Sequence, residues 1–235
     1  MAARRARAAG SYLQERISGV TGSIVFAADG RRVVPLGLSR ILAGESAFGA
    51  DGFRYCGNIL GCAGDAQFPA DERLLDRATL LAESVTRAFG LVGVNGVDFV
   101  ARRGLPYVIE VNPRYTAAME LVERAYGISL FDIHVRACRQ GLPAFDLAAA
   151  RRRASNAVGK AIVYARRPTG VGDTRPWLAD ADVRDISPPG TRFAPREPIC
   201  TIFARGRDAA ACFAGLRRRA TRLYHDVEDR EAQSA

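Results

Sequence analysis

Apolar and polar positions follow two kinds of pattern along the chain, and together these predict a mixture of helices and strands. From Pro69 to Gly90 apolar residues recur at helical spacing, which predicts a helix that buries one face. Further helices are expected after polar caps at Thr116 and Ser129 and near the C-terminus, at about 208–225. Short apolar or alternating runs predict strands at 24–26, 33–36, 97–101, 107–111, 158–165 and 199–204. Strand pairs combined with helices indicate an α+β fold.

The predicted elements divide the chain into two parts. Residues 1–146 hold the first hairpins and most of the helices, and residues 147–235 hold the rest. The second part is expected to begin with a basic helical linker at 147–155. A small β-rich subdomain with Pro- and Gly-rich turns then follows, and a terminal helix closes it.

Two of the predicted strands each carry a single acid in an apolar run. Val97–Ala101 is apolar except for Asp98, and Tyr107–Val111 is apolar except for Glu110. A turn centred on Gly104 places these acids directly across from each other, and the period of two adds Asn112 to the same face. The opposite face is expected to be core, and its residues are Val97, Phe99, Ile109 and Val111.

The opposed acids predict a cation site. Side chains directly across a ladder lie roughly 5 Å apart, where two negative charges repel by on the order of 3 kcal/mol. Magnesium takes carboxylate oxygens and completes its shell with water and phosphate oxygens, and Asn112 offers a third protein oxygen. Arg114 follows two residues later, where a guanidinium can grip a phosphoryl group. The alternative interpretation is a solvated sheet face, with each acid offset by an arginine and a plain turn at Pro113.

An acidic strand residue followed twelve positions later by Glu-x-Asn-Pro-Arg resembles the metal-binding hairpin of the ATP-grasp superfamily. The resemblance implies an ATP-grasp-like antiparallel sheet flanked by helices, and ATP with magnesium or manganese ions as cofactors. It implies that Asp98, Glu110 and Asn112 hold the ions that bridge the β- and γ-phosphates. Arg114 is then expected to contact the transferred phosphoryl group. Asp98 stands where many members have glutamate, so this carboxylate is shorter than usual.

Two further segments resemble parts of the same family. Residues 12–19 look like its adenine-contacting strand, which implies that Gln14, Glu15 and Ile17 meet the adenine edge. The Asp29-Gly30 pair after it is a type I′ turn signal, and an ordinary amphipathic strand is the alternative interpretation. Residues 53–59 look like a loop near the acceptor substrate, although a Gly/Asn turn alone also explains them.

More narrowly, residues 112–134 are similar to ATP-grasp proteins of tetrahydromethanopterin- and methanofuran-linked one-carbon metabolism, of which tyramine–glutamate ligase is the best known. The resemblance implies an ATP-dependent carboxylate–amine ligase acting on small molecules. In such an enzyme a carboxylate attacks the γ-phosphate to give an acyl phosphate, and an amine then displaces phosphate.

The start of the chain raises an alternative to a complete ligase. Family members usually have an upstream domain and a glycine-rich phosphate loop with lysines, and this chain begins just before the adenine strand. We therefore expect that activity needs an upstream half of the enzyme. A non-catalytic remnant or partner subunit remains the second hypothesis.

Composition excludes some other classes of protein. The chain is 48% hydrophobic and 25% charged, which is typical of a globular protein. No apolar run approaches the ~20 residues of a membrane helix, and the basic start lacks the apolar region of a signal peptide. A cytoplasmic protein without a membrane partner is expected. The five cysteines include no Cys-x-x-Cys pair, which argues against a disulfide framework or a zinc cluster.

The net charge of +9 raises a third hypothesis, binding of nucleic acid through arginine. Lys160 is the only lysine, and the basic clusters at 4–5, 151–153 and 217–219 lack interleaved aromatic residues. Solvated helix faces or linkers explain these clusters, so a nucleic-acid partner is the lowest-ranked hypothesis.

Overall fold

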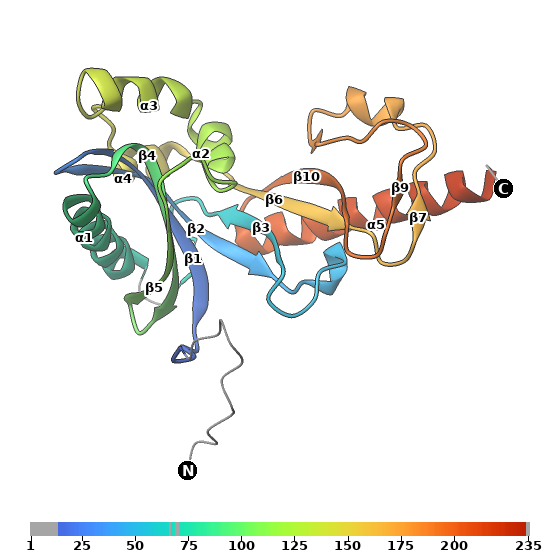
Figure 1. Cartoon of the computed structure of the whole chain (residues 1–235), viewed down its shortest axis with the longest axis horizontal. Coiled ribbons are helices and arrows are strands. Elements are labelled where there is room, and N and C mark those ends of the chain that lie inside the picture. The colour runs from blue at the N-terminus through green and yellow to red at the C-terminus, as the bar shows by residue number, and fades with distance from the viewer. Residues whose placement is uncertain (1–13, 66, 69–70, 234–235) are drawn as a thin grey trace, which may run out of the picture.

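A computed structural model describes residues 14–65, 67–68 and 71–233, and it is built around one eight-stranded antiparallel sheet (Figure 1). The strands in spatial order are β5 (Leu105–Asn112), β4 (Val92–Arg102), β1 (Val20–Asp29), β2 (Val33–Ala43), β3 (Tyr55–Leu60), β6 (Ala157–Tyr164), β10 (Pro198–Gly206) and β8 (Val183–Arg184). A separate ladder joins β7 (Thr169–Gly170) and β9 (Arg192–Phe193). The predicted α+β fold with an antiparallel sheet is confirmed.

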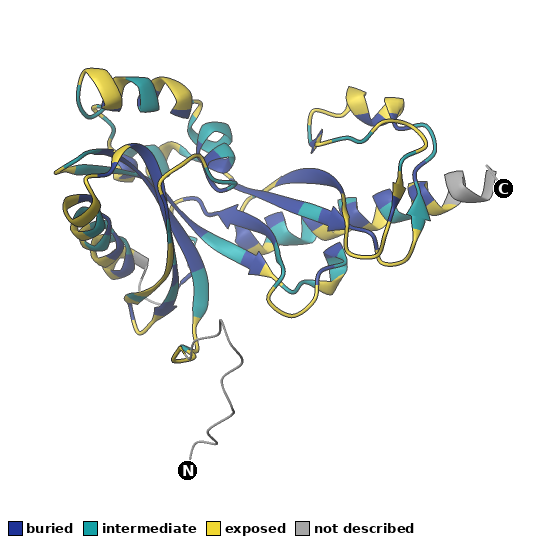
Figure 2. Cartoon of the chain, in the orientation of Figure 1, coloured by how far each residue is buried: buried dark blue, intermediate teal, exposed yellow. Residues whose placement is uncertain are grey.

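Helices cover both faces of this sheet (Figures 1 and 2). On one face, α1 (Asp71–Phe89) packs at the β5 end and α5 (Ala209–Gln233) at the β10 end. On the opposite face lie α2 (Met119–Tyr126) and α3 (Leu130–Arg139). The remaining helical segments are α4 (Leu147–Arg153), η1 (Ser46–Phe48) and η2 (Arg175–Ala179).

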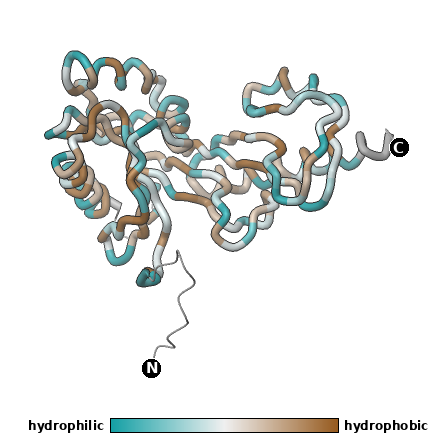
Figure 3. The backbone as a smooth tube through the Cα atoms, in the orientation of Figure 1, coloured by the Kyte–Doolittle hydropathy of each residue, from teal (hydrophilic) through white to brown (hydrophobic). Residues whose placement is uncertain are grey.

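The apolar stripes read from the sequence explain this packing. In α1 the side chains of Leu74, Ala78 and Ala82 are fully buried against β1 and β4, whereas Phe89, at the end of the predicted helical pattern, is 71% exposed. Hydrophobic stretches concentrate in the strands, and the peripheral loops are mostly hydrophilic (Figure 3). None of the helices in the described part of the chain is both long and apolar enough to cross a membrane.

The helix boundaries follow the predicted signals in part. The first helix ends at Gly90, whose φ of 63° suits glycine, and Ser129 caps α3 by accepting a hydrogen bond from the Asp132 amide at 3.1 Å. Thr116 does not cap α2, because that helix begins two residues later than predicted, with Ala118 at the cap position.

Two expected elements differ from the structure at the start of the chain. Residues 14–18 form no strand in the structure, and β1 begins only at Val20; residues 12–13 lie outside the described residues. The segment 53–59, expected to be a loop, contributes most of strand β3, because its backbone pairs with β2 on one side and β6 on the other.

The β4–β5 hairpin forms as predicted around a two-residue turn. Arg103 and Gly104 have φ values of 54° and 72°, the left-handed conformations of a type I′ turn. The ladder contains a bulge after Asp98, so that Phe99 faces Val108 rather than Ile109. Ile109 is consequently 50% exposed, and its expected place in the core was wrong.

The sheet continues across residue 146, where the division into two parts was expected. Strand β6 follows this point in sequence and pairs with β3, so that strands from both parts share one sheet. The largest hydrophobic cluster lies under β3, β6, β10 and α5, and two others lie under the β1–β5 region. The two-part division stays a prediction.

Candidate functional site

A row of polar side chains crosses six neighbouring strands on the face that α2 and α3 cover. Cross-strand register and one hydrogen bond connect its members, which we call the polar row: Glu110, Asp98, Ser23, Ser39, Asn58 and Lys160. Ser23, Ser39 and Asn58 are 1–2% exposed and Lys160 is 7% exposed. Asp98 is half-buried and Glu110 is exposed, so the row opens to solvent at its β5 end. Because buried polar groups need partners, the buried part of the row indicates a site or a structural network.

At the β5 end the row brings together all four residues of the predicted metal and phosphate site. Asp98 lies directly across from Glu110, as expected from the hairpin pattern. The amide of Asn112 donates to Glu110 Oε1 at 3.0 Å, and Arg114 Nη2 donates to Asn112 Oδ1 at 3.2 Å. All four line one cavity of about 180 Å³, together with Tyr55 and other neighbours.

The electrostatics of this cavity favour a bound cation. Burial raises the pKa of Asp98 to about 6, and the nearby Glu110 adds to this shift, whereas Ser23 and Arg114 oppose it. Burial, together with the negative charge of Asp98, also raises the pKa of Tyr55. The cavity therefore holds more negative charge than its own cation, Arg114, compensates.

The donor set fits a hard divalent ion such as magnesium or manganese. No cluster of three or more His, Cys, Asp or Glu residues that could hold a metal occurs in the described ranges, so the protein ligands would be Asp98, Glu110 and the Asn112 oxygen. Magnesium needs only a few protein ligands, because water and phosphate oxygens complete its coordination shell. The buried Thr116 hydroxyl on the cavity wall also lacks a hydrogen-bond partner among the described residues.

The three residues predicted to contact adenine lie outside this cavity. Gln14 and Glu15 are exposed and Ile17 is half-buried, in an irregular segment that precedes β1. Strand β1 starts with Val20 paired to Ala101, so the segment lies toward the turn of the β4–β5 hairpin. The adenine contacts stay a prediction.

At the β6 end the row ends in a cluster of ion pairs that was not predicted from the sequence. Lys160 Nζ lies 2.9 Å from Glu120 Oε2, and Arg124 lies 3.5 Å from the same carboxylate. Arg124 also pairs with Asp182 at 3.1 Å. One signal was available, because Lys160 is the single charged residue in an apolar strand, as Asp98 is in the run Val97–Ala101.

A comparison with protein families identifies this architecture. Residues 2–118 match the family model described as the ATP-grasp domain. The chain carries an ATP-grasp domain. The sequence-based resemblance at superfamily level is thereby confirmed, and ATP and Mg²⁺ are the cofactors with which proteins of this family work.

Solved structures show the same ATP-grasp fold at low sequence identity. The L-amino acid ligase from Bacillus licheniformis superposes with a TM-score of 0.64 at 16% identity, over 86% of this chain and 52% of that one. The biotin carboxylase domain of Hydrogenobacter thermophilus 2-oxoglutarate carboxylase, in complex with MgADP, ADP and bicarbonate, gives a TM-score of 0.54 at 14% identity, over 80% of this chain and 42% of that one.

A curated relative matches over a shorter stretch. The carbamoyl phosphate synthase large chain of Neisseria meningitidis serogroup A is 29% identical over 75 residues, which are 32% of this chain and 7% of that protein. This ATP-grasp chain thus spans about half of the amino acid ligase and a small part of the synthase.

Proposed function

We propose that this chain is the metal- and phosphate-binding part of an ATP-dependent carboxylate–amine ligase. The observation that carries the proposal is the cavity in which Asp98 opposes Glu110, with Asn112 and Arg114 beside them. Carboxylates that outnumber the cations at the solvent-open end of the polar row are suited to a phosphate-bridging cation. The ATP-grasp domain and its ligase neighbour support the same reaction class.

Each residue of the cavity has a task in this proposal. Asp98, Glu110 and Asn112 hold the metal, which when bound neutralises charge on the nucleotide phosphates. Arg114 is exposed and, among the described residues, hydrogen-bonds only to neutral oxygens, those of Asn112 and the Tyr115 backbone, so its guanidinium is available to the transferred phosphoryl group. Arg114 is the residue that we assign to catalysis, since it would stabilise charge that develops during transfer.

An apolar surface next to the carboxylates suits the adenine ring. Val100 and Tyr107 pair across the ladder and lie one step nearer the hairpin turn than Asp98, on the same face. Val100 is half-buried and Tyr107 is 38% exposed. A purine stacked there lies beside the irregular segment 14–18, where we assign its edge to Gln14, Glu15 and Ile17.

The acceptor side of the site is assigned to the β3 wall. Tyr55 and Asn58 line the cavity, and the Tyr55 hydroxyl donates to Asn58 Oδ1 at 2.5 Å. We assign the substrate carboxylate to this wall, within reach of the phosphoryl group that Arg114 holds. The small-molecule amine, the kinship with one-carbon ATP-grasp proteins and the need for an upstream half of the enzyme are part of the same proposal.

Titration with Mn²⁺ tests the metal site without requiring turnover. Wild-type protein should bind Mn²⁺ saturably by electron paramagnetic resonance, and Glu110→Gln should weaken binding at least tenfold, because one of only three oxygen ligands loses its charge. Glu83→Gln is the matched control, since Glu83 lies half-buried on α1, outside the cavity, and pairs with Arg87. Equal Mn²⁺ affinity in wild type and Glu110→Gln would refute the site.

Phosphate release from ATP tests the reaction itself. With a carboxylate and an amine present, wild-type chain or the chain supplemented with the upstream half should release phosphate, and Arg114→Ala should abolish release while saturable Mn²⁺ binding is retained. An intact Mn²⁺ site with no turnover under either condition would instead support the non-catalytic alternative.

A further inference from the structure

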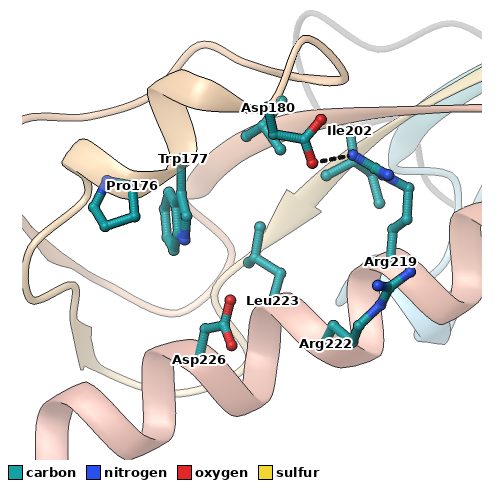
Figure 4. A pocket seen from close by; sticks show the side chains of 9 residues that line it. Pro176, Trp177, Asp180, Ile202, Arg219, Arg222, Leu223 and Asp226 are labelled. Atoms are coloured by element: carbon teal, nitrogen blue, oxygen red, sulfur yellow. Dashed lines mark hydrogen bonds and ion pairs between the residues drawn. The ribbon is translucent and has the colours of Figure 1, made fainter.

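A second cavity lies between α5 and the segment that contains η2 and β8, far along the sheet from the candidate ligase site (Figures 1 and 4). Its volume is about 270 Å³, and it shares no lining residue with the 180 Å³ cavity of the polar row. Small-molecule sites have volumes of roughly 300–1,000 Å³. A cavity just below this range suits a compact ligand rather than a nucleotide.

The interior of this cavity is apolar. Ile202 and Leu223 are 1% and 5% exposed and form its floor with Val183, and Trp177 contributes an aromatic wall. Trp177 is the only tryptophan of the chain. Such a lining favours an aliphatic or aromatic group, because burying it removes apolar surface from water on both sides.

Charged side chains surround this apolar floor, and two of them have no partner among the side chains that the structure describes. Arg219 and Asp180 form an ion pair with each other. Arg222 and Asp226 lie one helical turn apart on α5, and neither makes an ion pair or hydrogen bond with the side chains that the structure describes, which on this helix extend to Glu228. In Figure 4 the Asp226 carboxylate is directed toward the space beside Trp177, and the Arg222 guanidinium lies on the other side of Leu223.

The wall of the cavity is held in place by bonds of its own. The Asp182 amide donates to Asp180 Oδ1 at 2.8 Å, and the Phe203 amide donates to the Asp182 carbonyl at 2.8 Å. Thr174 Oγ1 donates to the Ser187 carbonyl at 2.8 Å at the base of the same segment. A preformed wall lowers the entropy lost on binding, so modest contacts suffice for measurable affinity.

We propose that this cavity binds a free α-amino acid with an apolar side chain. Its ammonium would meet Asp226, its carboxylate would meet Arg222, and its side chain would pack on Trp177 and Leu223. A ligand with only a positive charge would leave Arg222 without a partner, and one with only a negative charge would leave Asp226 without a partner. Only a zwitterion presents both charges on one carbon above an apolar floor, which is the arrangement that α5 offers.

Tryptophan fluorescence tests this proposal, because Trp177 alone reports on the cavity. L-Leucine should change the emission saturably in a solution that contains neither nucleotide nor metal, so the outcome is independent of the ligase proposal. 4-Methylpentanoate, which lacks the ammonium, and isopentylamine, which lacks the carboxylate, should each bind about tenfold more weakly, as expected for one lost charged hydrogen bond.

Two variants identify which residue of α5 binds each charged group of the ligand. Asp226→Asn should weaken L-leucine about tenfold and leave 4-methylpentanoate unchanged, and Arg222→Gln should weaken L-leucine and leave isopentylamine unchanged. Arg217→Gln, on the same helix but outside this cavity, should bind L-leucine like wild type. Absence of saturable L-leucine binding by both fluorescence and calorimetry would overturn the proposal, as would equal affinities for leucine and its two analogues.

Discussion

Both ends of the polar row contain charged side chains, but these form ion pairs with one another at only one of the two ends. At the β5 end two carboxylates face each other, and burial and their mutual proximity raise the pKa of Asp98 to about 6. At the β6 end Lys160 meets Glu120 at 2.9 Å, and Arg124 supports the same carboxylate. At the β5 end a ligand must balance the negative charge, whereas at the β6 end the charged side chains balance one another.

This difference separates a site from a structural contact. A buried charge without a partner is unfavourable, so evolution retains it mainly where a ligand supplies the partner. A buried ion pair contributes little net stability but is strongly destabilising when one member is removed. Substitutions at the two ends of the row should therefore change stability in opposite directions.

The largest effect is expected at the paired end. Lys160→Met leaves Glu120 with Arg124 alone and should lower the free energy of unfolding by about 3 kcal/mol, measured by denaturant unfolding. The double variant with Glu120→Leu should recover most of this loss, because the pair is replaced by apolar groups. Arg87→Met is the control, since its ion pair with Glu83 is exposed and should contribute below about 0.5 kcal/mol. If Arg87→Met and Lys160→Met lowered the free energy of unfolding equally, the paired end would not differ from an exposed ion pair.

The opposite sign is expected at the unpaired end. The folded pKa of Asp98 lies above its unfolded value of about 3.9, so the folded state loses stability as the pH rises from about 4 to about 6. Asp98→Asn removes this titration and should raise the free energy of unfolding at pH 8 by about 2 kcal/mol, after allowance for partial exposure. At pH 4 the variant should match wild type. Unfolding curves at the two pH values, recorded with a chelator present, measure the difference.

One part of the polar row could be predicted from the sequence, and the rest of it could not. The β4–β5 hairpin is local: an alternating pattern and Gly104 were enough to pair Asp98 with Glu110. The remainder of the row joins strands that are neighbours in the sheet but distant in sequence, so no local pattern places Asn58 beside Lys160. The error at Ile109 has a different origin, because a single bulged residue reverses which face a side chain takes.

A smaller effect should follow from adding metal to the wild-type protein. Mg²⁺ at about ten times its dissociation constant should stabilise the folded state by about 1.4 kcal/mol. Because binding requires ionised carboxylates, this gain should be present at pH 8 and should disappear as the pH falls through about 6. Thermal unfolding with and without Mg²⁺ gives the measurement. A gain of the same size in Asp98→Asn would show that the ion binds elsewhere.

The smallest effect is expected where the paired end reaches the surface. Asp182 accepts from Arg124 at 3.1 Å, but 43% of its side chain is exposed, so solvent screens the pair. Asp182→Asn should therefore lower the free energy of unfolding by only about 0.5 kcal/mol, and raised salt should erase the difference from wild type. A loss as large as that of Lys160→Met would mean that Asp182 belongs to the buried network. In that case the ion-pair cluster around Glu120 would extend to the wall of the Trp177 cavity, because the Asp182 amide donates to Asp180.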